Sequence, residues 1–305
     1  MPRFGIAPIL LVFLFSGLVI IATKRENNPQ INHPIMQKAV NLLIEDHIGH
    51  IIIQRADKAN AFDLATWHAL RDAFHEADRS PEVRCVLLRA EGKHFSAGID
   101  LSLLMQIKQE IDGIDCPGRA RERLLAFIKE LQSCIQAIED CRKPVIALVQ
   151  GGCIGGGVDI ITACDIRLCS AQAYFSVKEV DLGIVADLGT LQRLRHLVGE
   201  GIAREWAFTA RNITAQEAYE HKLVNRVEPD AEHLLQAGME MARTIAAKSP
   251  LAVRGTKQVM NYSRDHSVAE GLEYVALWNA AQLISKDIEA AMMAAFQKQT
   301  PSFQD

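Results

Sequence analysis

Residues 151–157 are the segment of this chain whose residue types most suggest chemistry. They read GGCIGGG and hold five of the 19 glycines, between an apparent strand and an apparent helix. Without Cβ atoms the backbone can approach a ligand closely, and free N–H groups at a helix start favour negative charge. A packing turn between a strand and a helix explains one or two of these glycines better than five. We therefore expect a loop that binds an anion.

This glycine run fits neither of two familiar phosphate-binding motifs. The pattern G-x-G-x-x-G fails at every register, and a Walker A loop needs Lys after its last glycine, where this chain has Val158. A nucleotide phosphate is therefore disfavoured. The remaining candidate is an anion that develops during a reaction, such as the oxygen of an enolate.

Three acidic residues that follow the run are candidates for proton transfer. Asp159 falls in the first turn of the predicted helix, where the macrodipole stabilises a carboxylate whether or not it does chemistry. Glu179 lies within residues 176–183, and Asp187 lies in an otherwise apolar stretch at 182–189. Apolar surroundings raise a carboxyl pKa toward the range in which it exchanges protons. An N-cap of the next helix explains Asp187 equally well, so both interpretations stay open.

Short β-prone runs that alternate with amphipathic helices must position these residues. The runs expected to be strands are 40–44, 50–54, 85–88 and 144–149, the first two joined as a hairpin. Apolar spacings of three and four predict a helix from residue 64 to 77, and a second, long helix is expected at 119–139. Nearly every segment beyond residue 199 predicts a helix. We divide the chain into a core at 36–200 and a helical C-terminal region at 201–305.

The first 35 residues differ from the rest. An apolar run of 19 residues starts at Phe4 and ends at Ala22, with basic residues on both sides, and just reaches the length that spans a membrane as a helix. A signal peptide would need a small-x-small cleavage site, which the run lacks at its end. We predict an uncleaved membrane anchor. Translation from Met36 is the alternative.

Composition excludes several classes of protein. With 305 residues, 33 basic and 37 acidic groups, the chain carries a net charge of −4, which disfavours a nucleic-acid partner. The seven cysteines are odd in number and contain no C-x-x-C pair, and the ten histidines form no H-E-x-x-H motif. We therefore expect a reducing compartment, no disulfide framework and no metal site.

Four motifs resemble the crotonase (enoyl-CoA hydratase/isomerase) superfamily. They are HFSAGIDL at 94–101, KPVIA at 143–147, GCIGGG at 152–157 and ACDIR at 163–167. The resemblance spans nearly all of residues 36–297. Within it, residues 177–181, 186–194 and 274–279 look most like the Δ3,5-Δ2,4-dienoyl-CoA isomerases.

This resemblance implies an α/β fold, a crotonase-like spiral of ββα units followed by a C-terminal helical trimerisation region. It also implies an acyl-CoA substrate, no cofactor apart from the coenzyme A of that substrate, and a homotrimer or homohexamer. The implied oxyanion hole consists of the backbone N–H groups of Ile99 and Gly156. The residues expected to line the bound thioester are Ala97, Gly98, Ile99, Asp100, Leu101 and Gly156.

The resemblance also implies roles for the three acids. Glu179 would take a proton from C2, Asp187 would deliver one to C6, and Asp159 would position or polarise this machinery. Hydratases of the family typically carry Glu at the positions of Asp159 and Glu179 and Gly at that of Asp187. The chain departs from the hydratase pattern twice, so an isomerase is the leading hypothesis.

Two other hypotheses are kept. One is an enoyl-CoA hydratase that adds water to a 2-enoyl-CoA, and the other is a non-enzymatic binding protein with the crotonase fold, tethered to a membrane by residues 4–22. Arg55 and Lys58 resemble the family's first CoA-contacting loop, but solvated loop charges explain them nearly as well. The expected location is the cytoplasm, at a membrane surface if the N-terminal segment is an anchor.

Overall fold

The computed structural model describes residues 39–305. The predicted anchor at residues 4–22 lies outside this range. Within the range, none of the helices combines the length and the apolar character that crossing a membrane requires.

Nine strands and eleven helices follow one another along the described residues. The strands are β1 (Val40–Glu45), β2 (Ile48–Ile53), β3 (Cys85–Ala90), β4 (Val145–Val149), β5 (Gly152–Ile154), β6 (Ile166–Ser170), β7 (Tyr174–Ser176), β8 (Ile213–Thr214) and β9 (Arg226–Glu228). The helices are α1 (Leu64–Arg79), α2 (Leu101–Asp112), α3 (Pro117–Asp140), α4 (Gly156–Thr162), α5 (Thr190–Val198), α6 (Glu200–Thr209), α7 (Ala215–Glu220), α8 (Ala231–Ala246), α9 (Pro250–Arg264), α10 (Val268–Gln282) and α11 (Lys286–Gln297). Two 3-10 turns, η1 (Ala56–Lys58) and η2 (Glu179–Leu182), complete the set.

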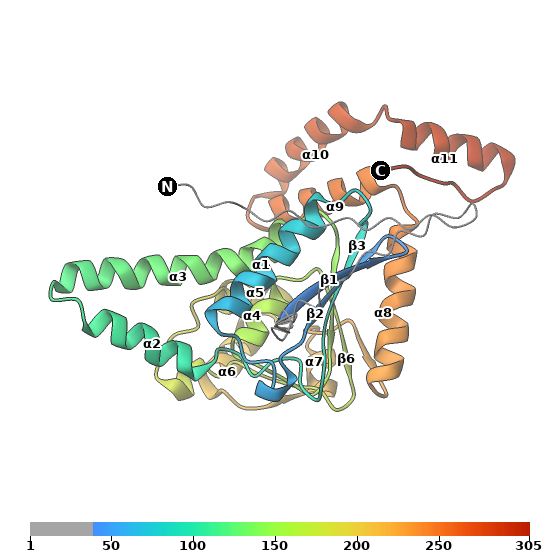
Figure 1. Ribbon diagram of the computed structural model, residues 1–305. Helices are drawn as coiled ribbons and strands as arrows, with labels where there is room; N and C mark the ends of the chain where they lie inside the picture. The colour runs from blue at the N-terminus through green and yellow to red at the C-terminus, as the bar shows by residue number, and fades with distance from the viewer. Residues whose placement is uncertain (1–38) are drawn as a thin grey trace, which may run out of the picture. The chain divides into compact units, whose positions relative to one another are not determined.

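The larger sheet has six strands in the order β1-β2-β3-β4-β6-β9, and it is parallel apart from the hairpin of β1 and β2 (Figure 1). The predicted hairpin is confirmed, with Asp46 and His47 forming its turn at φ values of 50° and 64°. A smaller sheet has the order β5-β7-β8. Successive turns of the chain add one strand to each sheet before a helix, as in β4-β5-α4 and β6-β7, so the expected spiral of ββα units is confirmed.

Alternate residues of the central strands face opposite sides of the larger sheet, as the period of two in a strand requires. Leu87 and Leu148 belong to a core cluster that α8 covers through Leu234. Leu88 and Ala147 face the other side and belong to a larger cluster that α1 and α3 cover. Figure 1 shows α8 on one face of the sheet and α1 and α3 on the other.

The division of the chain into a core at 36–200 and a helical region at 201–305 stays a prediction. Two short strands beyond residue 200 pair with strands of the core, since β8 lies beside β7 and β9 beside β6. These pairs bring the chain back to the edges of both sheets before α8 begins. From α8 onward the described chain is helical.

Candidate active site

All nine residues singled out from the sequence as catalytic, oxyanion-binding or substrate-binding line one cavity of about 480 Å³. They come from the loop before α2, from the glycine run that ends in α4, and from the segment between β7 and α5. Residues 97 and 187 are distant in sequence, so the spiral fold is what brings these segments to one place.

The first wall of the cavity is a loop pinned against the glycine run. Ser96 exchanges backbone hydrogen bonds with Gly152 and Ile154 at 3.1 and 3.0 Å, and its hydroxyl accepts from the Gly98 amide at 3.0 Å. Gly98 has φ +86°, and a Cβ there would lie 2.7 Å from the Ile154 carbonyl oxygen and 3.1 Å from the Gly156 nitrogen. Only glycine fits this approach without moving the backbone.

The backbone amides of Ile99 and Gly156 are free to donate into this cavity. Gly156 is the first residue of α4, so its N–H has no partner within the helix. The neighbours of Ile99 bond across to Phe62, which donates to Gly98 and accepts from Asp100, while no protein acceptor within residues 39–305 takes the Ile99 amide. Two adjacent unpaired donors suit a developing oxyanion.

Asp159 lies in the first turn of α4, as predicted, and is almost completely buried. Its Oδ1 accepts a hydrogen bond of 2.7 Å from the backbone amide of Thr190, the first residue of α5. Burial raises its pKa to about 6, and this hydrogen bond opposes the shift. The Asp159 carboxylate therefore links α4, which begins at Gly156, to the start of α5, which follows Asp187.

Glu179 begins η2 and projects one carboxyl oxygen into a space without a protein partner. Its Oε2 is buried and has no hydrogen bond within the described residues, while its Oε1 faces Gly155, where a Cβ would lie 3.1 Å away. Burial, and then the negative charge of Asp159, raise its pKa to about 7. An unpaired carboxyl oxygen with this pKa is suited to act as a general base.

Asp187 does not cap the next helix. That helix, α5, begins at Thr190 with Gly189 as its N-cap, and it is Asp159 that accepts from its first amide. The N-cap interpretation of Asp187 is therefore wrong. Burial raises the pKa of the Asp187 carboxyl, which favours the neutral form that a proton donor needs.

Asp100 and Arg55 hold the cavity loop together through their own pairing. The Asp100 carboxylate accepts from Ser102 as the N-cap of α2 and pairs with Arg55 at 2.9 Å, and these contacts lower its pKa to about 2. Arg55 also pairs with Asp63 at 2.9 Å. Arg55 is thus not a solvated charge, whereas Lys58 lies on the cavity wall.

Sequence reasoning missed the apolar part of the cavity wall. Leu182, Ile184 and Leu188 line it, and none of them was singled out as a site residue. Trp67 lies directly behind Gly156, where a Cβ would come within 3.1 Å of its ring. The only available signal was the apolar stretch around Asp187. Within residues 39–305 no group of three or more His, Cys, Asp or Glu side chains could hold a metal ion.

Residues 44–305 match the enoyl-CoA hydratase/isomerase family. The chain belongs to this family and is an enzyme of the crotonase superfamily. Among curated proteins, the peroxisomal Delta(3,5)-Delta(2,4)-dienoyl-CoA isomerase of Arabidopsis thaliana is 48% identical over 259 residues, which cover 85% of this chain and 93% of that protein. The mitochondrial dienoyl-CoA isomerase of Homo sapiens is 45% identical over 251 residues, with coverage of 82% and 76%.

The fold is also that of solved members of the family. The crystal structure of an enoyl-CoA hydratase from Bacillus anthracis superimposes with a TM-score of 0.78 at 29% identity, covering 87% of this chain and 99% of that one. The hydratase shares the fold at lower identity than the isomerases, so the structural likeness does not separate the two activities.

Proposed function

We propose that the protein converts a 3,5-dienoyl-CoA to a 2,4-dienoyl-CoA. The observation that carries this proposal is the set of three acids, Asp159, Glu179 and Asp187, which line one cavity with two unpaired backbone amides. The similarity to dienoyl-CoA isomerases over most of the chain supports it. A hydratase has no evident use for the third acid.

The first step is removal of a proton from C2 by Glu179. The electron pair of the C2–H bond moves into the thioester, and the carbonyl oxygen becomes an oxyanion between the amides of Ile99 and Gly156. One such donor contributes about 3 kcal/mol to lowering the barrier. Two fixed donors in a largely apolar cavity therefore make the dienolate accessible to a carboxylate base.

The second step returns a proton to the far end of the dienolate. Asp187, neutral at this stage, donates its proton to C6, the double bonds settle at C2 and C4, and the oxyanion collapses to the carbonyl. Glu179 ends protonated and Asp187 ionised, so exchange with solvent resets both. Asp159, bonded to the Thr190 amide, holds the two catalytic segments in register.

The proposal is tested by assaying the purified protein on two thioesters. Conversion of a 3,5-dienoyl-CoA to the 2,4-isomer brings the diene into conjugation with the thioester carbonyl, so the absorbance band moves to longer wavelength. We expect this change and only slow hydration of crotonyl-CoA. Brisk hydration of crotonyl-CoA without isomerisation of the diene would favour a hydratase instead.

The raised pKa values predict a bell-shaped dependence of kcat/KM on pH. The reaction needs Glu179 ionised and Asp187 protonated, and the pKa values of both carboxyls are raised. We therefore expect kcat/KM to fall by about tenfold per pH unit at low pH, where Glu179 is protonated, and again at high pH, where Asp187 is ionised. The two pKa values read from this profile describe the pair of acids and not either residue alone. A flat profile between pH 5 and 8 would argue against a carboxylate base.

We propose that the protein assembles as a homotrimer or homohexamer through its C-terminal helices. Large apolar side chains of α10, α11 and the turn between them are exposed within this protomer, and a soluble monomer rarely exposes so many together. They include Val268, Leu272, Leu277, Ile284, Met293 and Phe296. Sedimentation equilibrium should give three or six protomers, and Leu272→Glu with Phe296→Glu should shift the protein toward monomers, whereas a monomeric wild type would contradict the proposal.

For location we propose the cytoplasm, at a membrane surface if residues 4–22 act as an anchor. The relatives named above are peroxisomal and mitochondrial proteins by their names. Fractionation of cells that produce the full chain, beside a chain starting at Met36, tests the anchor. The full chain should sediment with membranes and the shorter one should not, and equal distribution of both would exclude an anchor.

A further inference from the structure

The loop that carries Asp187 separates two cavities. Asp187 and Leu188 line the cavity of about 480 Å³ described above, and they also line a second one of about 800 Å³ behind the loop, next to α3. Asp187 therefore lies between the two cavities. Only one of these sides holds the oxyanion donors.

Side-chain packing fixes only part of this loop, because Ala186 and Leu188 are buried in the larger core cluster while the residues before them are not. Val185 is 71% exposed and Ile184 41%. Within residues 39–305 no other residue donates a hydrogen bond to the Asp187 carboxyl, whose partner is the backbone amide of Asp187 itself. The position of the carboxyl therefore depends on the backbone on either side of it.

Two side chains donate hydrogen bonds to that backbone, one from α3 and one from α5. The Gln132 amide donates to the Asp187 carbonyl oxygen at 2.7 Å. The Arg193 guanidinium donates to the next carbonyl, that of Leu188, at 3.4 Å. The two bonds hold consecutive peptide groups on the side away from the active cavity.

Arg193 is held rigidly for this task. Its Nε pairs with Glu139 of α3 at 2.7 Å, and the exposed fractions of the two side chains are 14% and 10%. Its Nη2 also donates to Gln136 at 3.0 Å. Gly189 makes room for it, because a Cβ there would lie 1.9 Å from Nη1, and its φ of +124° suits glycine.

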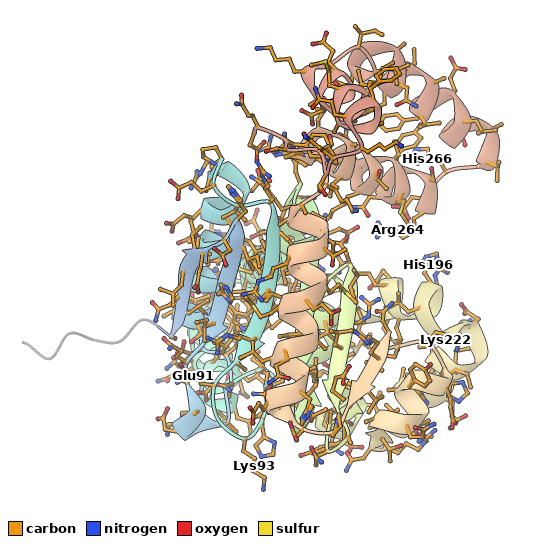
Figure 2. All side chains as sticks on the ribbon, turned by 90° about the vertical axis from the view of Figure 1, so that its right-hand side faces the viewer. Glu91, Lys93, His196, Lys222, Arg264 and His266 are labelled. Atoms are coloured by element: carbon orange, nitrogen blue, oxygen red, sulfur yellow. The ribbon has the colours of Figure 1, made fainter. Side chains whose placement is uncertain are left out.

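Glu139 connects this arrangement to the C-terminal helices. Its second oxygen pairs with Arg264 of α9 at 2.6 Å. Burial alone would raise the pKa of Glu139, but the hydrogen bonds from the two arginines hold it below its usual value, so the carboxylate is ionised. Figure 2 shows Arg264 on the C-terminal helices and His196 of α5 on the facing side of the core; both line a further cavity.

We propose that Arg193 and Gln132 are positioning residues for Asp187, which hold its loop so that the carboxyl faces the reacting carbons, and that the pair of Glu139 and Arg264 fixes Arg193 in this role. The inference rests on the proposed isomerase function and deepens it. A displacement of the acid by about 1 Å can cost a hundredfold in rate. The base and the oxyanion donors do not depend on these contacts.

Because the base and the acid act in different steps, the ratio of exchange at C2 to isomerisation distinguishes a misplaced Asp187 from a general loss of folded enzyme. If Asp187 is misplaced, Glu179 still removes the C2 proton, the dienolate is reprotonated at C2, and the substrate exchanges hydrogen with solvent. Isomerisation should therefore fall while exchange at C2 continues. General loss of folded enzyme would lower both rates by the same factor.

The test compares both rates in D2O for the full-length wild type, Arg193→Gln, Arg193→Lys, Gln132→Glu and Arg264→Gln. Lys257→Gln is the matched control, because Lys257 is also on α9 and pairs with Asp165 at 2.7 Å, but does not contact the loop. Isomerisation is followed by absorbance and C2 exchange by mass spectrometry of recovered substrate. Circular dichroism verifies folding.

For Arg193→Gln we expect kcat for isomerisation to fall about a hundredfold, with KM and C2 exchange changed less than about threefold. For Arg193→Lys and Gln132→Glu we expect kcat for isomerisation to fall about tenfold. Lysine lacks the planar fork that bonds to Leu188 and Glu139 together, and glutamate has no N–H to donate to the Asp187 carbonyl oxygen. Arg264→Gln should show a smaller fall, and the control should keep the wild-type ratio of the two rates.

Two results would overturn the inference. One is an unchanged ratio of exchange to isomerisation in folded Arg193→Gln or, if that variant does not fold, an unchanged ratio in Gln132→Glu. The other is the same change of ratio in Lys257→Gln. A wild type that does not isomerise the diene at all would instead overturn the proposed function, and the inference with it.

Discussion

Replacing Glu179 by Gln should lower kcat for diene isomerisation by about a thousandfold. The amide keeps the size and the position of the side chain beside Gly155 but cannot accept the C2 proton. KM should change little, because the Oε2 atom makes no contact that holds the loop. Isomerisation of the diene is followed by absorbance, and exchange at C2 is measured in D2O. We expect both reactions to be lost together in this variant.

The same variant should be more stable than the wild type at alkaline pH. The folded pKa of Glu179, about 7, lies above its ordinary value of 4.5, so the native state binds this proton more tightly than the unfolded chain does. Stability that depends on this proton is present below pH 4.5 and is lost as the pH rises through 7. Thermal or urea unfolding at pH 8 should therefore favour Glu179→Gln by about 3 kcal/mol, with no such gain at pH 4.

Glu232→Gln is the control for that pair of measurements, since this glutamate is exposed on α8, away from the cavity. It should match the wild type in rate and in the pH dependence of stability. Retention of more than about a tenth of the wild-type isomerisation rate by Glu179→Gln would remove this carboxylate from the role of base.

Replacing Asp187 by Asn should separate the two half-reactions. Isomerisation should fall by about a hundredfold to a thousandfold, because the amide cannot supply the proton for C6. Exchange at C2 should continue within about threefold of the wild-type rate, since Glu179 and both backbone donors remain. The same D2O experiment measures both quantities.

Asp181→Asn is the matched control for this variant. Asp181 lies in η2, six residues before Asp187, and its carboxylate is half exposed beside Lys178. Both rates should stay near those of the wild type. Loss of C2 exchange together with isomerisation in Asp187→Asn would show that the two acids do not have separate tasks.

Much of the site follows from local features of the sequence. The five glycines of residues 151–157 exceed what a packing turn needs and predicted a binding loop, and Gly155 and Gly156 of this run do line the cavity. The position of Asp159 alone placed it in the first turn of a helix. The hairpin of β1 and β2 followed from the polar and glycine residues between two β-prone runs. Each of these predictions depends on residues within a few positions of one another.

The features that the sequence could not predict depend on distant segments. The local pattern allowed Asp187 to be either a proton donor or a helix cap. The structure excludes the cap, because Asp159, 28 positions earlier, accepts the hydrogen bond from the Thr190 amide. Likewise, the pairing of Glu139 with Arg193 and the pairing of Arg55 with Asp100 join parts of the chain that only the fold brings together. Their charges carry no periodicity that would mark them out.

The position of solvent hydrogen in the product tests the central claim most directly. When a 3,5-dienoyl-CoA is converted in D2O, separate base and acid carboxyls predict a 2,4-dienoyl-CoA with one deuterium at C6, delivered by Asp187 after exchange with solvent. Nuclear magnetic resonance of the product locates the label. Finding the original C2 hydrogen at C6, or a 3-hydroxyacyl product, would contradict the two-carboxyl mechanism.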